Sequence, residues 1–248
     1  MNATQRTIVL IPARMASSRL PGKPLAMIGG LPMTVQVLRR GEEAKLGPVV
    51  VAAAESEIVR SVEKAGGRAI LTDPSLPSGS DRIHAGLQAI DPDGEYEVVI
   101  NLQGDLPAIS PGAIVNCHRA LLDSGADIAT LASEIEDSEE LENPNVVKAM
   151  ARFETGQTVA IAEDFQRRLP AGWSGPQLHH VGLYAYRRTA LEAFVSLPPS
   201  KRERERKLEQ MRALDAGMTI AVGLVDTIPF GVDTPEDLER ARALFSAA

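Results

Sequence analysis

The sequence predicts an α/β fold with a mostly parallel central sheet flanked by helices. In the first half of its 248 residues, short apolar runs alternate with segments in which apolar residues recur at helical spacing. Such alternation is typical of parallel strands joined by helical crossovers. No long polar linker interrupts the chain, so we expect a single domain over residues 1–248 with a smaller sheet inserted into it.

The individual elements follow from local patterns. We expect strands at the apolar runs of residues 7–11, 49–53, 68–71 and 98–102. Helices are expected where apolar residues recur every three or four positions, at residues 32–43, 55–65 and 80–90. In the second half, the patterns predict a strand at residues 178–187, a charged helix at 200–216 and a last helix that begins at Thr234.

A loop at residues 11–25 follows the first expected strand and is rich in small residues, proline and glycine. It carries Arg14, Arg19 and Lys23, whereas the first acidic residue of the chain is Glu42. The opening segment is therefore cationic in a protein whose formal net charge is -7. A loop that leaves a parallel strand with backbone N–H groups and spaced cations favours a bound polyphosphate. The alternative is a solvated basic loop.

Composition argues against several classes of protein. The acidic balance disfavours a general nucleic-acid binder but not a protein that binds a small nucleotide. The single cysteine, Cys117, excludes an internal disulfide framework. Residues 1–6 lack the apolar segment of a signal peptide, and no apolar run approaches the length of a membrane span. We therefore expect a soluble cytoplasmic protein with no membrane partner.

Two aspartates lie where a metal site is expected. Asp105 follows the strand at 98–102, at the carboxyl end where α/β sheets bind ligands; the alternative is a role in a turn. Asp233 precedes the last helix, where Thr234 suits the N-cap and Asp237 completes a capping box. Capping does not require Asp233. Two carboxylates that meet over a phosphate loop would make a Mg²⁺ site, since Mg²⁺ takes one or two carboxylates together with substrate phosphates.

A second loop of small residues, at 77–82, opens the helix expected at 80–90. Its serines suit an N-cap, and its hydroxyl and backbone N–H groups equally suit contact with a base or a ribose. The glycine patterns of dinucleotide-binding and P-loop proteins are absent from the sequence, which disfavours a nicotinamide-dependent dehydrogenase.

The strand expected at 178–187 alternates with a period of two. One face is apolar, whereas the other carries His180, Tyr184 and Tyr186 and suits the floor of a polar pocket for an anionic or hydroxylated substrate. The alternative is an aromatic face exposed to solvent. Because adjacent residues of a strand point to opposite faces, His179 and His180 do not suit one metal ion.

Taken together, these motifs resemble those of the 3-deoxy-manno-octulosonate (Kdo) cytidylyltransferases, the CMP-Kdo synthetases. The resemblance runs nearly end to end and preserves the order of the motifs. The matching segments are residues 11–25, 78–82, 102–105, 143–148, 179–187, 208–212 and 231–238. The first and last of these segments are long, which makes chance a poor explanation.

The resemblance implies a nucleotidyltransferase fold of Rossmann-like type, a homodimer, and a reaction in which CTP and Kdo give CMP-Kdo and pyrophosphate for lipopolysaccharide biosynthesis. It implies that an insertion around residues 143–217 serves sugar binding or dimerisation. It also implies that Mg²⁺ is the cofactor. No covalent enzyme intermediate is required.

The resemblance also implies roles for individual residues. The triphosphate would be bound by Arg14, Arg19 and Lys23. The cytidine site would be lined by Ser78, Gly79, Asp81, Arg82 and Gln103. The metal would be held by Asp105 and Asp233, which with Arg14 and Lys23 are the residues implied to be catalytic. The sugar acid would be contacted by Arg167, His180, Tyr184, Glu209 and Gln210.

A few positions depart from the family pattern. Ala53 and Ala54 stand where the family usually has threonine and aspartate. Arg206 replaces a glutamate, and Leu106 stands where glutamate or phenylalanine is commoner. Arg167 would stand in for the family arginine that meets the sugar carboxylate. The segments for CTP match the family pattern, whereas those for the acceptor are altered.

Two further functions therefore stay open at this point. The first is the same chemistry on another acidic sugar, such as an amino-Kdo or a sialic-type acid. The second is a catalytically weak paralogue that binds nucleotide, which the alanines at 53 and 54 favour and the two retained aspartates disfavour.

Overall fold

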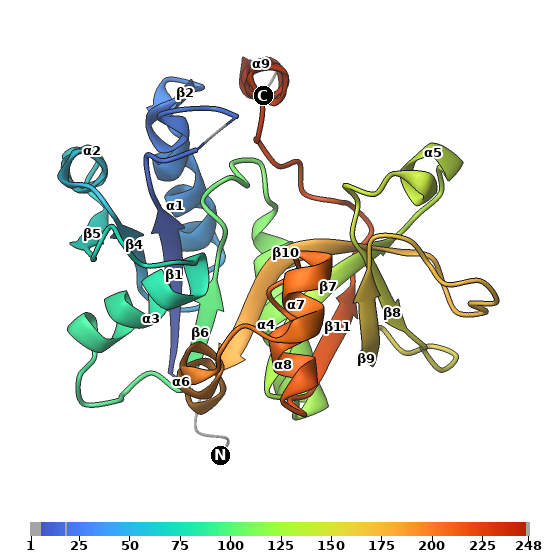
Figure 1. Ribbon diagram of the computed structural model, residues 1–248. Helices are drawn as coiled ribbons and strands as arrows, with labels where there is room; N and C mark the ends of the chain where they lie inside the picture. The colour runs from blue at the N-terminus through green and yellow to red at the C-terminus, as the bar shows by residue number, and fades with distance from the viewer. Residues whose placement is uncertain (1–5, 18, 247–248) are drawn as a thin grey trace. The chain divides into compact units, whose positions relative to one another are not determined.

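The computed structural model describes residues 6–17 and 19–246 (Figure 1). Residues 1–5, on which the expectation about a signal peptide mainly depends, lie outside the described residues. The chain divides into two compact units. The first unit comprises Met1–Val115 and Pro229–Ala248, and the second comprises Asn116–Ile228.

The first unit is built on parallel strands in the order β5-β4-β1-β6. Their bounds are β1 (Thr7–Ala13), β4 (Val49–Ala53), β5 (Arg68–Leu71) and β6 (Val98–Asn101). All residues of β4 and β6, and all but one of β1, are buried. Strands covered on both faces read as continuous apolar runs, which explains why the sequence located them.

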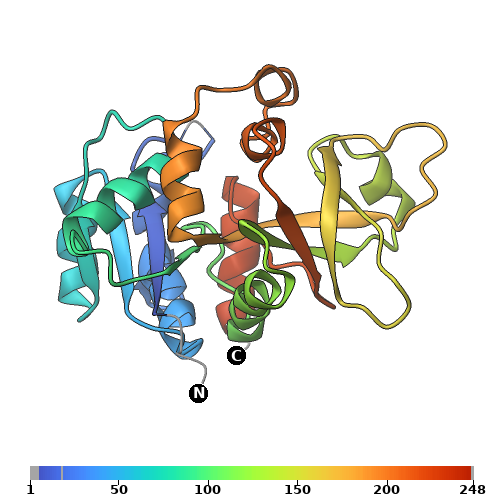
Figure 2. The same ribbon diagram turned by 90° about the horizontal axis from the view of Figure 1, so that it is seen from below.

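Three helices cover this sheet on both faces, as the alternation predicted. They are α1 (Met33–Glu43), α2 (Ser56–Lys64) and α3 (Gly79–Ile90). Figure 2 shows α1 and α3 on opposite sides of β1. The chain therefore leaves β1 on one side of the sheet and reaches β6 from the other. This reversal places a crevice beyond the carboxyl ends of β1 and β6, where open α/β sheets bind ligands.

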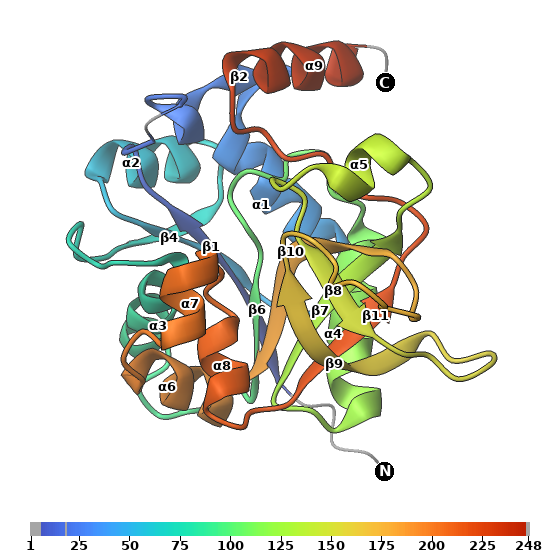
Figure 3. The same cartoon turned by 45° about the vertical axis from the view of Figure 1, so that its right-hand side comes forward.

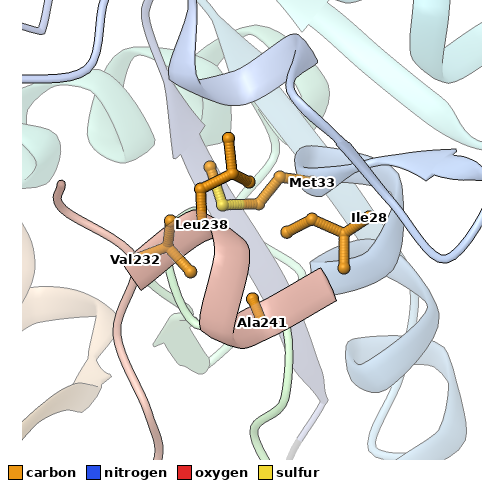
Figure 4. Close-up of a cluster of buried hydrophobic side chains, with 5 residues drawn as sticks. All are labelled: Ile28, Met33, Val232, Leu238 and Ala241. Carbon is orange, nitrogen blue, oxygen red and sulfur yellow. The ribbon is translucent and has the colours of Figure 1, made fainter. Parts of the chain in front are cut away.

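The C-terminal helix α9 (Pro235–Ser246) returns to the first unit and lies beside β2 (Met27–Ile28), as Figure 3 shows. Between β1 and α1 the chain also forms the short helix η1 (Lys23–Leu25) and the strand β3 (Leu31–Pro32), which pairs with β2. Apolar side chains hold α9 in place. Figure 4 shows the buried cluster that they form, which consists of Ile28, Met33, Val232, Leu238 and Ala241.

The second unit contains strands in the order β10-β7-β11-β9-β8, some paired parallel and some antiparallel. Its strands are β7 (Ile128–Glu134), β8 (Lys148–Ala151), β9 (Val159–Gln166), β10 (Leu178–Arg187) and β11 (Ile220–Leu224). The start of β10 also pairs with β8, which closes these strands on one another.

The helices of the second unit are short apart from α4 (Pro111–Ser124), which begins in the first unit. The others are α5 (Ser138–Glu142), α6 (Arg188–Ser196), α7 (Lys201–Arg206) and α8 (Met211–Asp215). No helix in the described part of the chain is long and apolar enough to cross a membrane.

The single helix expected at 200–216 is wrong. The chain forms α7 and α8 instead, because Lys207 adopts a left-handed backbone with φ 55° that ends the first helix. A capping box between Ser200 and Glu203 starts α7. After the break at Lys207, the Leu208 side chain is buried, with 6% of it exposed. Burial of Leu208 was not visible in the charged composition of the segment.

Candidate active site

One cavity of about 350 Å³ in the first unit collects most residues that the sequence assigned to the nucleotide and the metal. Of the predicted residues, it is lined by Arg14, Arg19, Lys23, Ser78, Gly79, Arg82, Gln103, Asp105 and Asp233. The loops after β1 and β6, the start of α3 and the segment before α9 supply these side chains. Sequence reasoning did not assign the other lining residues, which are Pro12, Ala13, Ala16, Ser17, Pro24 and Gly104.

The basic loop after β1 is held by hydrogen bonds that its backbone N–H groups donate. Met15 N donates to Glu55 Oε2 at 2.9 Å, and Gly22 N donates to Met15 O at 3.3 Å. Arg14, next to this anchor, remains exposed on the cavity wall. The sequence patterns did not identify Glu55 as the residue that holds this loop. An acidic residue two positions after the strand expected at 49–53 was a signal that could have identified it.

The two aspartates meet at a single cation. Lys23 Nζ lies 2.9 Å from Asp105 Oδ2 and 2.9 Å from Asp233 Oδ1, and Arg19 Nη2 lies 2.9 Å from Asp233 Oδ2. The Lys23 side chain is 16% exposed. Burial by itself lowers the pKa of Lys23, but the two carboxylates outweigh it and raise that pKa. The ammonium is therefore charged, and carboxylates 128 positions apart in sequence share it.

Backbone contacts position these carboxylates independently of Lys23. Val232 N donates to Asp105 O at 2.9 Å, which ties the segment before α9 to the loop after β6. Asp237 Oδ2 accepts from Asp233 N at 3.0 Å and from Thr234 N at 2.9 Å, and Asp237 N donates to Thr234 Oγ1 at 3.2 Å. These bonds confirm the expected cap of the last helix.

At the start of α3, Ser78 forms the N-cap. Ser78 Oγ accepts from Asp81 N at 3.2 Å and donates to Asp81 Oδ2 at 2.6 Å. The Asp81 side chain is thereby engaged with the cap, and it is not among the residues that line the cavity. Asp81 orients the Ser78 hydroxyl that does line it.

Arg82, one of the residues that line this cavity, has an unsatisfied donor. The residue is 2% exposed, and its Nη1 donates to Thr72 Oγ1 at 2.7 Å and to Asp73 O at 3.1 Å. Its Nη2 is buried and has no hydrogen-bond partner among the described residues. A buried guanidinium N–H without a partner is costly, so it marks a place where a ligand oxygen is expected. The supporting role of Thr72 was not recognised from the sequence.

In the second unit, His180, Tyr184 and Tyr186 share one face of β10, as the alternation predicted. Their rings form a row with centroids 5.6 and 6.0 Å apart. The row is not open to solvent: His180 is 8% and Tyr186 3% exposed, and Tyr184 between them is half-buried. An irregularity between Val181 and Tyr184 interrupts the pairing of β10 with β7. The alternative of a solvated aromatic face is therefore wrong.

Burial sets the protonation of this row. His180 Nε2 lies 2.9 Å from Thr130 Oγ1, and burial lowers the pKa of His180 to about 3. Burial, and then Tyr186 and Glu209, raise the pKa of Tyr184. Both side chains are therefore neutral at physiological pH and offer hydrogen bonds rather than charge.

Glu209 and Gln210 lie in the short connection between α7 and α8. Gln210 is 7% exposed, and its Nε2 has no hydrogen-bond partner among the described residues. Glu209 Oε1 lies 4.0 Å from Arg212 Nη2. The buried amide donor of Gln210 thus resembles the Nη2 group of Arg82, because each lacks a protein acceptor among those residues.

An ion pair between α7 and α8 fixes this connection. Arg212 donates from Nη2 to Glu203 Oε1 at 2.7 Å and from Nε to Oε2 at 2.9 Å. The two side chains are only 9% and 12% exposed, and the guanidinium also stacks over Phe194. A two-bond contact of this kind holds two helices in a defined orientation.

We expect Glu203→Gln to lower the free energy of unfolding at pH 7 by about 3 kcal/mol, because the Arg212 guanidinium loses its buried counter-ion. Burial by itself raises the pKa of Glu203, but hydrogen bonds from Arg212 and from the Ser200 backbone outweigh it and lower that pKa. A carboxyl with a lowered folded-state pKa stabilises the protein above its unfolded-state value of about 4.5 and loses this effect as the pH falls through the folded-state value.

Urea unfolding at several pH values checks this expectation. The difference between wild type and Glu203→Gln should shrink below about pH 4. The control is Glu205→Gln, since Glu205 is 60% exposed and forms only a 3.8 Å contact with Lys201. A difference that does not depend on pH would contradict the assignment of this pair.

Comparison with known proteins identifies the family. A family model described as cytidylyltransferase matches residues 8–220. The 3-deoxy-manno-octulosonate cytidylyltransferase of Parvibaculum lavamentivorans is 58% identical over 236 residues, which cover 95% of this chain and 91% of the relative. The chain belongs to the 3-deoxy-manno-octulosonate cytidylyltransferase family. The enzyme of that name from Rhodospirillum rubrum is also 58% identical, over 98% of this chain and 96% of its own.

Solved structures agree with this membership. A structure of CMP:2-keto-3-deoxy-manno-octonic acid synthetase complexed with CTP matches with a TM-score of 0.87 at 36% identity, over 98% of this chain and 99% of its own. A nucleotidyl transferase from Methanothermobacter matches with a TM-score of 0.65 at 14% identity, which shows a shared fold alone. The predicted fold class and family resemblance are both confirmed.

The structure gives packing or hydrogen-bonding roles to three departures from the 3-deoxy-manno-octulosonate cytidylyltransferase pattern. Ala53 and Ala54 are 0% and 6% exposed, and neither lines the cavity. Leu106, 8% exposed, packs against the Gly231 backbone, with its Cδ2 3.7 Å from the point that a Cβ on Gly231 would occupy. Arg206 donates from Nη1 to Asp164 Oδ1 at 2.7 Å and stays within the second unit.

Arg167 is engaged with the backbone of the second unit. Its Nε, Nη1 and Nη2 donate to Arg206 O at 3.0 Å, Pro144 O at 3.0 Å and Lys207 O at 3.3 Å. Lys148 supports the same region, because its Nζ donates to the carbonyls of Asn143, Val146 and Arg167 at 2.8, 2.9 and 3.1 Å. These bonds use three of the five N–H donors of the guanidinium, which leaves one N–H on Nη1 and one on Nη2 for a further acceptor.

Proposed function

We propose that this chain activates Kdo with CTP, giving CMP-Kdo and pyrophosphate. The observation that carries the proposal is the convergence of Asp105 and Asp233 on one cation, beside the basic loop, in a single cavity. A cavity with two carboxylates and several cations suits a nucleoside triphosphate with its metal ion. Membership of the 3-deoxy-manno-octulosonate cytidylyltransferase family supports both substrates.

In the proposed reaction, the anomeric hydroxyl oxygen of the sugar forms a bond to the α-phosphorus of CTP, and the hydroxyl proton passes to solvent. The bond from that phosphorus to the bridging oxygen of the β-phosphate breaks, and pyrophosphate leaves with the electron pair. Negative charge grows on the departing phosphates, so Arg14, Arg19 and Lys23 stabilise the transition state by lying on the wall of the same cavity.

The residues present fit a magnesium ion. Asp105 and Asp233 offer hard oxygen donors, and the Lys23 ammonium already bridges one oxygen of each. In residues 6–17 and 19–246, histidine, cysteine, aspartate and glutamate side chains form no group of three or more that could hold a metal ion. The two carboxylates are therefore the protein ligands that we propose for Mg²⁺. When bound, Mg²⁺ would neutralise charge on the phosphates of the nucleotide.

The cytidine part of CTP is assigned to Ser78, Gly79, Arg82 and Gln103, with Asp81 acting through Ser78. The unsatisfied Nη2 of Arg82 supports this assignment, since it needs an acceptor oxygen that the described residues do not supply. All four residues line the cavity.

The acceptor sugar is assigned to His180, Tyr184, Glu209, Gln210 and Arg167. The neutral rings of His180 and Tyr184 and the unsatisfied Nε2 of Gln210 suit hydroxyl groups of a sugar. Arg167 would recognise the carboxylate with the N–H groups of Nη1 and Nη2 that its backbone contacts leave over. We also propose a cytoplasmic homodimer, as the family resemblance implies; light scattering on the purified protein would measure the oligomeric state.

Pyrophosphate release tests the proposal. The protein would be incubated with CTP and Mg²⁺ and with Kdo, an amino-Kdo, a sialic acid or no sugar. Release with Kdo supports the proposed function, and release with another acid alone moves the specificity to the altered acceptor segments. If CTP binds but no sugar causes release, the nucleotide-binding paralogue becomes the better account.

A further inference from the structure

Lys23 occupies a position that a divalent cation would share. Its Nζ lies 2.9 Å from one oxygen of Asp105 and 2.9 Å from one oxygen of Asp233. The two carboxylates thus contribute one oxygen each to a common cation, which is the arrangement of a bridging ion. A metal ion placed between the same two oxygens would lie where Nζ lies, and two cations repel each other at that position, so they compete for it.

The backbone that positions the two aspartates is held by contacts that do not involve the Lys23 ammonium. The hydrogen bond from Val232 N to Asp105 O and the two bonds to Asp237 hold the aspartate backbones. Val232 is also buried in the apolar cluster of Figure 4, together with Leu238 at the start of α9. Removal of the Lys23 amine should therefore leave two facing carboxylates with no central cation.

The ammonium is carried by a flexible side chain. Lys23 is held by its backbone, since Lys23 N donates to Leu20 O at 3.1 Å, and the amine is attached through four flexible methylene groups. The same cavity is lined by Arg14 and Arg19, the side chains proposed to bind the triphosphate. When phosphates are present, the displaced ammonium has a new anionic partner nearby.

We propose that Lys23 is an exchangeable counter-ion of the Asp105–Asp233 pair, which opposes metal binding in the absence of nucleotide and couples metal binding to CTP. This inference rests on the proposed role of the two aspartates as metal ligands. Without CTP, a metal ion must displace the ammonium into solvent. With CTP, the phosphates accept the displaced ammonium, so metal and nucleotide strengthen each other's binding.

The test is a Mn²⁺ titration of the full-length protein, followed by electron paramagnetic resonance of the free ion, with and without saturating CTP and in the absence of sugar. In the absence of CTP, we expect Lys23→Met to bind Mn²⁺ about tenfold more tightly than wild type, a typical size for coupling between two sites. Lys64→Met is the control for lost charge, because Lys64 is exposed on α2, and it should bind Mn²⁺ like wild type.

The second expected result concerns coupling. CTP should tighten Mn²⁺ binding to wild type by a larger factor than it tightens binding to Lys23→Met. Circular dichroism would confirm that the variant is folded, and Lys23→Gln serves the same comparison if the methionine variant is not. Equal Mn²⁺ affinity of wild type and both folded variants without CTP would overturn the counter-ion role while leaving the metal assignment intact.

A third comparison separates the counter-ion role of Lys23 from the metal-binding role of the two aspartates. Lys23→Met combined with Asp105→Asn should lose the tight Mn²⁺ binding, because one of the two carboxylates is gone. If wild type fails to bind Mn²⁺ even with CTP, the metal assignment itself is wrong and the inference falls with it.

Discussion

Replacement of Asp105 by asparagine is expected to lower pyrophosphate release from CTP and Kdo by about 10³-fold, because a metal ion that contributes several kcal/mol to the transition state loses one of its carboxylates. Asparagine keeps the shape of the side chain and the Asp105 carbonyl that accepts from Val232 N at 2.9 Å. The free energy of unfolding should therefore change little. Initial rates over a range of Mg²⁺ concentrations would measure the effect, with thermal unfolding beside them.

The matched control is Asp93→Asn. Asp93 is an exposed aspartate of the first unit outside the cavity, so this change alters net charge equally without touching the site. Its rate should equal that of wild type. Unchanged turnover in folded Asp105→Asn would contradict the proposal that Asp105 is a metal ligand.

The second large effect is expected at Gly104, which lies between Gln103 and Asp105. A Cβ at Gly104 would lie 2.7 Å from Pro12 O, a backbone atom of β1 that has no freedom to move aside. Gly104→Ala must therefore displace the loop after β6, and with it the two flanking side chains. We expect kcat/KM to fall about 10²-fold, since misplacement by about 1 Å has an effect of that order.

Steady-state kinetics with CTP and Kdo would measure this loss, and the apparent Mg²⁺ requirement should rise with it. The control is Gly112→Ala in the first turn of α4, where the nearest atom to an added Cβ is Ser110 Oγ at 3.9 Å. Alanine is the better helix former, so this variant should be at least as stable as wild type. Equal kinetics for the two glycine variants would show that the close approach at Pro12 is not needed for the site.

The strands and helices of the first unit were predictable because their burial leaves clear hydrophobic patterns in the sequence. Strands β1, β4 and β6 are buried on both faces, so their apolar runs are unbroken, and the helices between them carry one apolar face each. The capping box around Thr234 and Asp237 acts within a few residues, so its sequence signal was equally direct. The break at Lys207 lacked such a signal, because the left-handed residue there is not glycine.

The sequence by itself determined the parallel α/β organisation, the basic loop with Arg14, Arg19 and Lys23, and the family, because these depend on neighbouring residues or on motifs that keep their order. Only the tertiary structure decided that Asp105 and Asp233 share the Lys23 ammonium, since that contact joins segments far apart in the chain. It likewise decided that Arg82 keeps an unsatisfied buried N–H among the described residues while Arg167 donates to three backbone carbonyls. Hydrogen-bond partners depend on which segments meet after folding, and composition or spacing does not specify them.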